Sequence, residues 1–118
     1  TYVYAGYSFT SPGIVDQIIP STMTLNKTFT APSGHYPLLA LTYDGTYVYA
    51  GYFTSPGIVD QIIPSTMALN NTFTSGFNKV HALTSDGTYV YAGYSVTASP
   101  GVVNQIAYRG AVKRISIS

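Results

Sequence analysis

The segment Thr-Tyr-Val-Tyr-Ala-Gly-Tyr occurs three times in this chain of 118 residues, and this repeat limits the folds that are open to it. The copies divide the chain into residues 1–45, 46–87 and 88–118. In the first two units, residues 9–23 and 53–67 are also identical. Self-similarity over about 40–45 residues is typical of repeat architectures, in which each unit is one supersecondary element that needs neighbours.

Each unit is predicted to consist of β-strands. Tyr, Val, Ile, Thr and Phe are abundant, whereas no segment keeps a helical apolar period for long. Asp44-Gly45 and Asp86-Gly87 predict tight hairpin turns with a positive φ at both residues. The predicted strands are residues 38–43, 47–52, 58–63 and 69–74 in the second unit and 80–85, 89–94, 102–108 and 112–117 in the third.

Four short antiparallel strands in each unit indicate an all-β fold built from β-propeller blades. A parallel β-helix would need shorter coils, and a β-sandwich gives no reason for near-identical copies. We therefore expect residues 1–118 to form a single partial β-propeller of about three blades, the first of which lacks its first strand. Because propellers close with about 4–8 blades, the ring would be completed by more chain or by self-association.

Residues 80–93, Val-His-Ala-Leu-Thr-Ser-Asp-Gly-Thr-Tyr-Val-Tyr-Ala-Gly, carry a resemblance to a known family. They resemble the repeat of the YVTN-type β-propellers, which include surface-layer-like β-propeller proteins. In that pattern a short apolar strand, an Asp-Gly turn and a Tyr-Val-containing strand follow one another. The resemblance covers all three units, and it implies an extracellular or cell-surface protein.

Composition excludes several classes of function. Charged residues make up 8% of the chain and the formal net charge is +1, which is a poor footprint for nucleic acid. The chain has no Cys, so disulfides and thiol catalysis are excluded. No apolar run approaches the ~20 residues of a membrane span. No catalytic arrangement or phosphate-binding loop is visible, and we expect neither an enzyme nor a cofactor.

Polar positions that recur in the units are expected to have structural roles. Asp16, Asp60 and Asn104 are equivalent, and we expect them to bond to neighbouring groups in preference to holding a cation. Asp44 and Asp86 fit turn geometry. His35 and His81 do not occupy equivalent positions, so we predict no metal site. The tyrosines are expected to pack between blades, although stacking on a sugar is an alternative.

The rim loops are the candidate binding site, because the first two units differ in length there. Asn26 and Asn70 begin Asn-x-Thr sequences and are glycosylation candidates. Three basic residues near the C-terminus, Arg109, Lys113 and Arg114, suggest a docking position. The predicted partner-binding residues of the rim are His35, Tyr36, Phe77, Asn78 and Lys79.

These patterns together predict an extracellular structural or binding module whose loops contact a protein or a glycan. The alternatives are a carbohydrate-binding, lectin-like propeller and the propeller portion of a quinoprotein-like enzyme whose catalytic residues lie outside this sequence. The expected partners are further copies of the chain or further blades of a longer chain.

Overall fold

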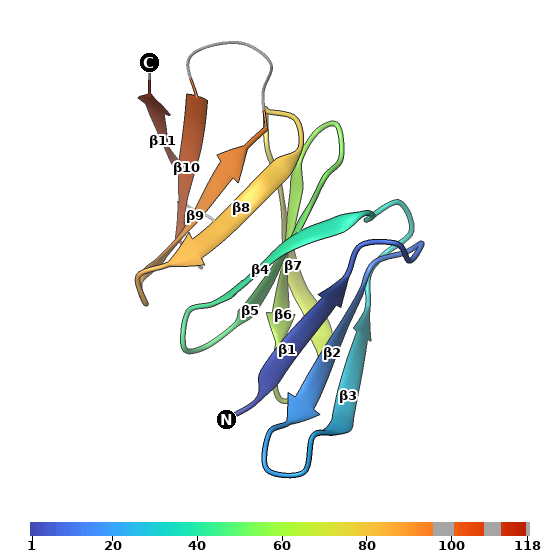
Figure 1. The fold of residues 1–118 in the computed structure, drawn as a ribbon. Coiled ribbons are helices and arrows are strands. Elements are labelled where there is room, and N and C mark those ends of the chain that lie inside the picture. The colour runs from blue at the N-terminus through green and yellow to red at the C-terminus, as the bar shows by residue number, and fades with distance from the viewer. Residues whose placement is uncertain (96–100, 108–111, 118) are drawn as a thin grey trace.

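The computed structural model describes residues 1–95, 101–107 and, for the backbone alone, 112–117. The described chain is all β, with three antiparallel sheets and no helix (Figure 1). The first sheet has the order β1-β2-β3, the second β4-β5-β6-β7, and the third β11-β10-β9-β8. Their strands are β1 (Val3–Tyr7), β2 (Ile14–Ile19), β3 (Thr24–Thr30), β4 (Leu38–Tyr43), β5 (Val48–Tyr52), β6 (Ile58–Ile63), β7 (Ala68–Thr74), β8 (Val80–Ser85), β9 (Tyr89–Tyr94), β10 (Gly101–Ala107) and β11 (Val112–Ile117).

The predicted strands of the second and third units are confirmed, with shifts of one residue at some ends. Residue 108, which was included in the third strand of the last unit, lies outside the described residues. The identical strands of the first two units pair in the same register, although the loop between them is one residue longer in the first unit: Tyr7 lies opposite Ile14, and Tyr52 lies opposite Ile58. Register is therefore set within each unit by its own side-chain pattern.

The Asp-Gly turns differ from the prediction in one respect. Gly45 and Gly87 have φ values of 97° and 92°, but the preceding aspartates do not have a positive φ. The Asp44 carboxylate accepts hydrogen bonds from the backbone N–H groups of Thr46 and Tyr47, at 2.8 and 2.7 Å. The side chain thus closes a longer turn, and only the glycine needs the left-handed conformation.

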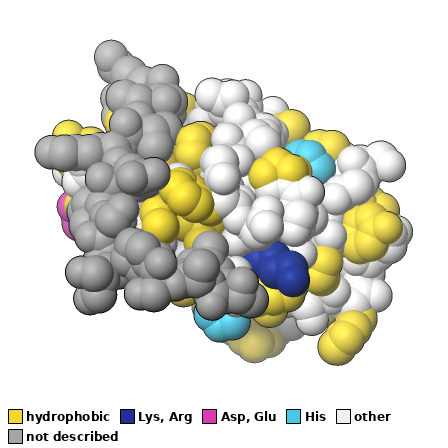
Figure 2. Space-filling view, turned by 90° about the horizontal axis from the view of Figure 1, so that it is seen from above, with side chains coloured by type: hydrophobic (Ala, Val, Ile, Leu, Met, Phe, Trp, Pro, Cys, Tyr) yellow, Lys and Arg dark blue, Asp and Glu magenta, His cyan; other side chains and the backbone are white. Residues whose placement is uncertain are grey.

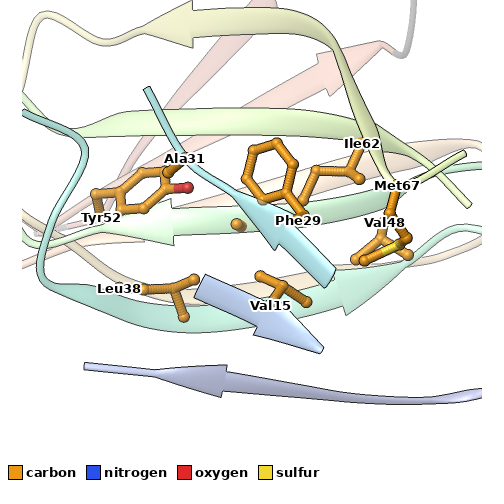
Figure 3. Packing of buried hydrophobic residues seen from close by; sticks show 9 residues of the cluster. Val15, Phe29, Ala31, Leu38, Val48, Tyr52, Ile62 and Met67 are labelled. Atoms are coloured by element: carbon orange, nitrogen blue, oxygen red, sulfur yellow. The ribbon is translucent and has the colours of Figure 1, made fainter. Parts of the chain in front are cut away.

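The three sheets stack face against face, and the two interfaces form the core. Strand β4 lies between β1 and β8 and contacts both of them (Figure 1). Figure 3 shows the first interface: Val15 and Phe29 of the first sheet, with Ala31 just after β3, pack against residues of the second sheet. The first cluster comprises Val15, Phe29, Ala31, Leu38, Val48, Ala50, Tyr52, Ile62 and Met67, and the second Tyr49, Val59, Val80, Val90, Ala92, Tyr94, Val102 and Ile106.

A glycine in each of the first two units lets the next sheet approach closely. A Cβ atom on Gly6 would lie 2.5 Å from the Leu38 side chain, and one on Gly51 would lie 2.6 Å from the Val80 side chain. Neither glycine has a positive φ, so it is the space, and not the backbone conformation, that requires glycine.

Identical strands differ sharply in burial. Val48 and Tyr52 of β5 are 1% and 0% exposed, whereas the matching Val3 and Tyr7 of β1 are 46% and 42% exposed. A Cβ atom on Gly93, which matches Gly51, would meet only the backbone oxygen of Ala82 of its own sheet, at 4.0 Å. Among the described residues, the first and third sheets therefore each have one face that no other sheet covers.

Candidate functional site

A buried polar cluster joins the first two sheets. Asp60 on β6 is 0% exposed, and its Oδ1 atom accepts a hydrogen bond from the Thr72 hydroxyl at 2.7 Å. Its Oδ2 atom lies 2.9 Å from Nδ1 of His35, which belongs to the loop between β3 and β4. The His35 ring also packs on Tyr52, with the ring centroids 5.4 Å apart. Asp60 therefore links the loop of the first unit to the sheet of the second.

The next junction has the same plan with two coordinated changes. The backbone oxygens of His35 and Phe77 accept equivalent hydrogen bonds, from the N–H groups of Gly13 and Gly57 at 2.9 and 2.7 Å. Phe77 packs on Tyr94 with the ring centroids 5.5 Å apart. Asn104 takes the place of Asp60, and its amide donates to the Tyr94 hydroxyl at 2.7 Å. The first junction thus combines the His35 imidazole with the Asp60 carboxylate. The second junction combines the Phe77 phenyl ring with the Asn104 amide.

In the first sheet, no loop of the described residues lies against the equivalent carboxylate. Asp16 accepts hydrogen bonds from the Thr28 hydroxyl at 2.7 Å and the Tyr7 hydroxyl at 3.1 Å, and both bonds are exposed. The expected role of Asp16, Asp60 and Asn104 in local hydrogen bonding is confirmed. Among the described residues, no group of three or more His, Asp or Glu side chains could hold a metal ion.

Burial raises the pKa of the Tyr52 hydroxyl well above its ordinary value, and the nearby Asp60 charge raises it further. That hydroxyl has no hydrogen-bond partner within the described structure. Burial is also the main cause that raises the pKa values of Tyr49 and Tyr94. Since these phenols ionise more readily in the unfolded chain, the fold is favoured fully below about pH 10 and loses this stabilisation as the pH rises further.

We predict that Tyr52→Phe will raise the midpoint pH of alkaline unfolding, because it removes a buried hydroxyl that ionises more readily in the unfolded chain. Stability at neutral pH should change by less than about 1 kcal/mol, since no hydrogen bond is lost. Absorbance at 295 nm and circular dichroism, followed together from pH 8 to 12.5, measure ionisation and unfolding. A midpoint that does not move in this variant would contradict the assignment.

A second polar row, which the sequence analysis did not identify, runs along the opposite rim. Gln61 donates to the Tyr49 hydroxyl at 3.0 Å and accepts from the Asn70 amide at 2.7 Å. The Tyr49 hydroxyl donates to Asp44 at 2.8 Å, so these hydrogen bonds connect the turn after β4 with strands β5, β6 and β7. Tyr4 and Gln17 pair in the same way in the first sheet, as do Tyr91 and Gln105 in the third. Their recurrence at matched positions was the available signal.

The predicted rim residues divide into two groups. His35 and Phe77 turn into the junctions between sheets, as described above. Tyr36, Asn78 and Lys79 are exposed, and the Lys79 ammonium lies 5.1 Å from the centre of the Phe53 ring. Seen from above, the described side chains on this side are mostly uncharged, with hydrophobic side chains between polar ones (Figure 2). The structure thus leaves Tyr36, Asn78 and Lys79 as the accessible members of the predicted binding site.

Both glycosylation candidates are exposed strand residues on the opposite rim. Their Nδ2 atoms already donate hydrogen bonds, from Asn26 to Gln17 at 2.8 Å and from Asn70 to Gln61 at 2.7 Å. A glycan would be attached to the same nitrogen, which would then keep one proton for such a bond. Glycosylation at these positions stays a prediction.

An open groove lined by tyrosines lies near the same rim, between the first two sheets. Its volume is about 470 Å³. The rings of Tyr4 and Tyr43 are 6.1 Å apart, and Lys27 donates to the Ser65 carbonyl at 2.5 Å. The lining also includes the buried Gln17, which donates to the Pro64 carbonyl at 2.9 Å. The Gln17 amide already donates to Tyr4 and Pro64, so the aromatic faces and the Lys27 ammonium are the groups that suit a ligand with both apolar and hydroxyl surfaces.

The chain matches no protein-family model and no curated protein in comparisons with known sequences. No helix of the described residues is long and apolar enough to cross a membrane. Of the basic trio predicted at the C-terminus, Arg109 lies outside the described residues, as do the side chains of Lys113 and Arg114. The described residues form an all-β structure of three antiparallel sheets, with buried polar residues at the junctions between them.

Proposed function

We propose that this chain is a non-catalytic β-propeller module of an extracellular or cell-surface protein, in which the blades form a scaffold and the rim loops contact a partner. One observation carries the proposal: two junctions within the chain are built alike, while the same residues face outward on the first sheet. The partly buried His35 and the buried Asp60 and Asn104 are engaged in these junctions. The resemblance to YVTN-type repeats supports the same proposal.

The uncovered faces favour a unit that associates with further blades, either more of the same chain or other copies. Burial of an apolar face is the main source of stability in a repeat array. Two outer faces that match the two sides of an internal junction are complementary to each other, so copies can join head to tail. The exposed side chains Val3 and Tyr7 then become as buried as Val48 and Tyr52.

Solution mass tests this proposal. We expect light scattering to show assemblies larger than the 12.6 kDa chain, and the variant Val3→Lys to shift them toward the monomer. Val3 is 46% exposed, so this variant should leave the strand itself folded. A mass near 12.6 kDa combined with a cooperative thermal transition would contradict the proposed ring of blades.

A carbohydrate-binding module is the second candidate, and the tyrosine-lined groove favours it. Each Tyr ring offers an apolar face to a sugar ring, and Lys27 places an ammonium group nearby. A glycan array would show selective binding that Tyr43→Ala abolishes if this candidate holds. The matched control is Tyr89→Phe, since Tyr89 is exposed on another sheet and does not line the groove.

A further inference from the structure

An aromatic and basic cluster lies on the rim at the junction of the second and third sheets. Phe53 directly follows β5, Lys79 directly precedes β8, and His81 belongs to β8. The Lys79 ammonium lies 5.1 Å from the centre of the Phe53 ring, and the Phe53 and His81 ring centroids are 6.2 Å apart. Lys79 and His81 are exposed, and Phe53 is half-buried. These three residues form the basic rim cluster.

The two basic residues are a paired difference between units that are otherwise nearly identical. Lys79 and His81 take the places that Pro37 and Leu39 have in the second unit. Leu39 belongs to the sheet that has a neighbouring sheet on each face, and it is still 43% exposed. This rim position is therefore open to a ligand even where both faces of the sheet are covered.

The backbone of Lys79 is held in a conformation that lysine does not favour. Its φ is 61°, in the left-handed region. Its N–H group donates to the Thr54 carbonyl at 2.7 Å, and its carbonyl accepts from the Ser95 N–H group at 2.9 Å. Glycine adopts this conformation at a lower cost, so stability alone does not explain a lysine here. A non-glycine residue held in this region is a feature of functional sites.

The chemistry of the cluster suits a small anion that also has an apolar face. Among the described residues, neither Lys79 nor His81 forms an ion pair with an acid. The ammonium has three donors for a carboxylate, and the two rings add apolar surface. The backbone N–H groups of Phe53 and Lys79 are already bonded, to Pro37 and Thr54. An extended peptide would therefore find side chains alone, which favours a sugar ring.

We propose that the basic rim cluster binds an acidic sugar, that is, a pyranose ring that carries a carboxylate. Lys79 binds the carboxylate, and the ring of the sugar packs on Phe53 and His81. The tyrosine-lined groove is a different place, since none of the three residues lines it. This inference rests on the proposed function, because it names a ligand for the rim loops.

Titration with two matched sugars, followed by the amide signals in NMR spectra, tests the site. D-glucuronate and D-glucose differ only in the carboxylate at C6. Glucuronate should shift the amide signals of Lys79 and His81 and bind about tenfold more tightly than glucose, because glucose lacks the charge-assisted bond. The acidic peptide acetyl-Gly-Asp-Gly-amide should bind more weakly than glucuronate. Equal affinity for glucose or for the peptide would overturn the assignment to an acidic sugar.

Variants separate a binding role from a structural one. Lys79→Gly should lose about tenfold in affinity for glucuronate while its Tm stays the same or rises, since glycine suits the backbone there. His81→Leu, which copies Leu39, should also weaken binding. The control is Tyr89→Phe, which lies outside the cluster and should bind glucuronate as the parent does. Unchanged affinity in Lys79→Gly, or loss of binding in Tyr43→Ala, would show that the cluster is not the site.

The outcomes separate this inference from the proposed function. If copies associate but glucuronate does not bind, the acidic-sugar site is wrong and the stacked blades still stand. If the chain is a cooperative monomer and glucuronate does bind, the propeller assembly is wrong. The site then stands alone, because all three of its residues belong to a junction within one chain.

Discussion

Gly51→Val is expected to destabilise the fold by about 1–3 kcal/mol, because it overfills a packed interface. The first atom added, Cβ, would lie 2.6 Å from Cγ1 of Val80 and 3.2 Å from Cδ1 of Leu83. Val80 is 0% exposed, so it has no free space to move into. The second and third sheets must therefore separate or shift. Thermal unfolding should show a lower Tm, by about 4–8 °C for each kcal/mol.

Gly93→Val is the matched control, since the glycine has the same neighbours in sequence. There the added Cβ would meet no side chain among the described residues, and valine favours a strand more than glycine does. The monomer should keep its stability or gain slightly. If copies associate as proposed, this variant should also weaken the association, because Gly93 occupies the outer face. Equal destabilisation by both substitutions would contradict the stacking described above.

A double substitution at the first junction should restore what either single substitution removes. His35→Phe leaves Oδ2 of the buried Asp60 without its nitrogen partner, and leaving a buried polar group unsatisfied costs about 1–3 kcal/mol. Adding Asp60→Asn removes the charge and copies the Phe77 and Asn104 combination of the next junction. The double variant should therefore be more stable than His35→Phe alone, with a coupling energy of about 1–3 kcal/mol.

Urea unfolding of the four proteins, the parent and the three variants, measures this coupling. Asp16→Asn is the control, because Asp16 has no loop against it and its hydrogen bonds are exposed. Its cost should stay below about 1 kcal/mol. If the cost of the double variant equals the sum of the costs of the two single variants, His35 and Asp60 do not act as a pair.

The positions of the strands were predictable because they depend on short-range pattern. Alternating apolar residues and the Asp-Gly turns placed the strands of the last two units, and the structure has them within about one residue. The turn geometry was predicted wrongly, because the Asp44 carboxylate satisfies two backbone N–H groups and so leaves only Gly45 with a positive φ. Hydrogen bonds from a side chain to a nearby backbone change a turn in ways that residue type alone does not reveal.

The contacts between sheets required the tertiary structure. Sequence comparison placed His35 in a variable loop and treated it as a candidate for a partner at the rim. In the fold its ring turns inward to Asp60, on a strand of the next unit 25 residues away. Its equivalence to Phe77 was hidden by the different lengths of the two loops, and it appears only in the shared backbone bonds to Gly13 and Gly57.

The repeat by itself determined the period, the strands and the local pairing, since each unit contains its own hairpins and turns. The tertiary structure decided which copies of the same residues are core and which are surface. Val3 and Val48 have identical neighbours in sequence and differ from 46% to 1% in exposure. The physical reason is that burial is a property of what lies against a face, and a repeated sequence cannot specify which of its copies has a neighbour.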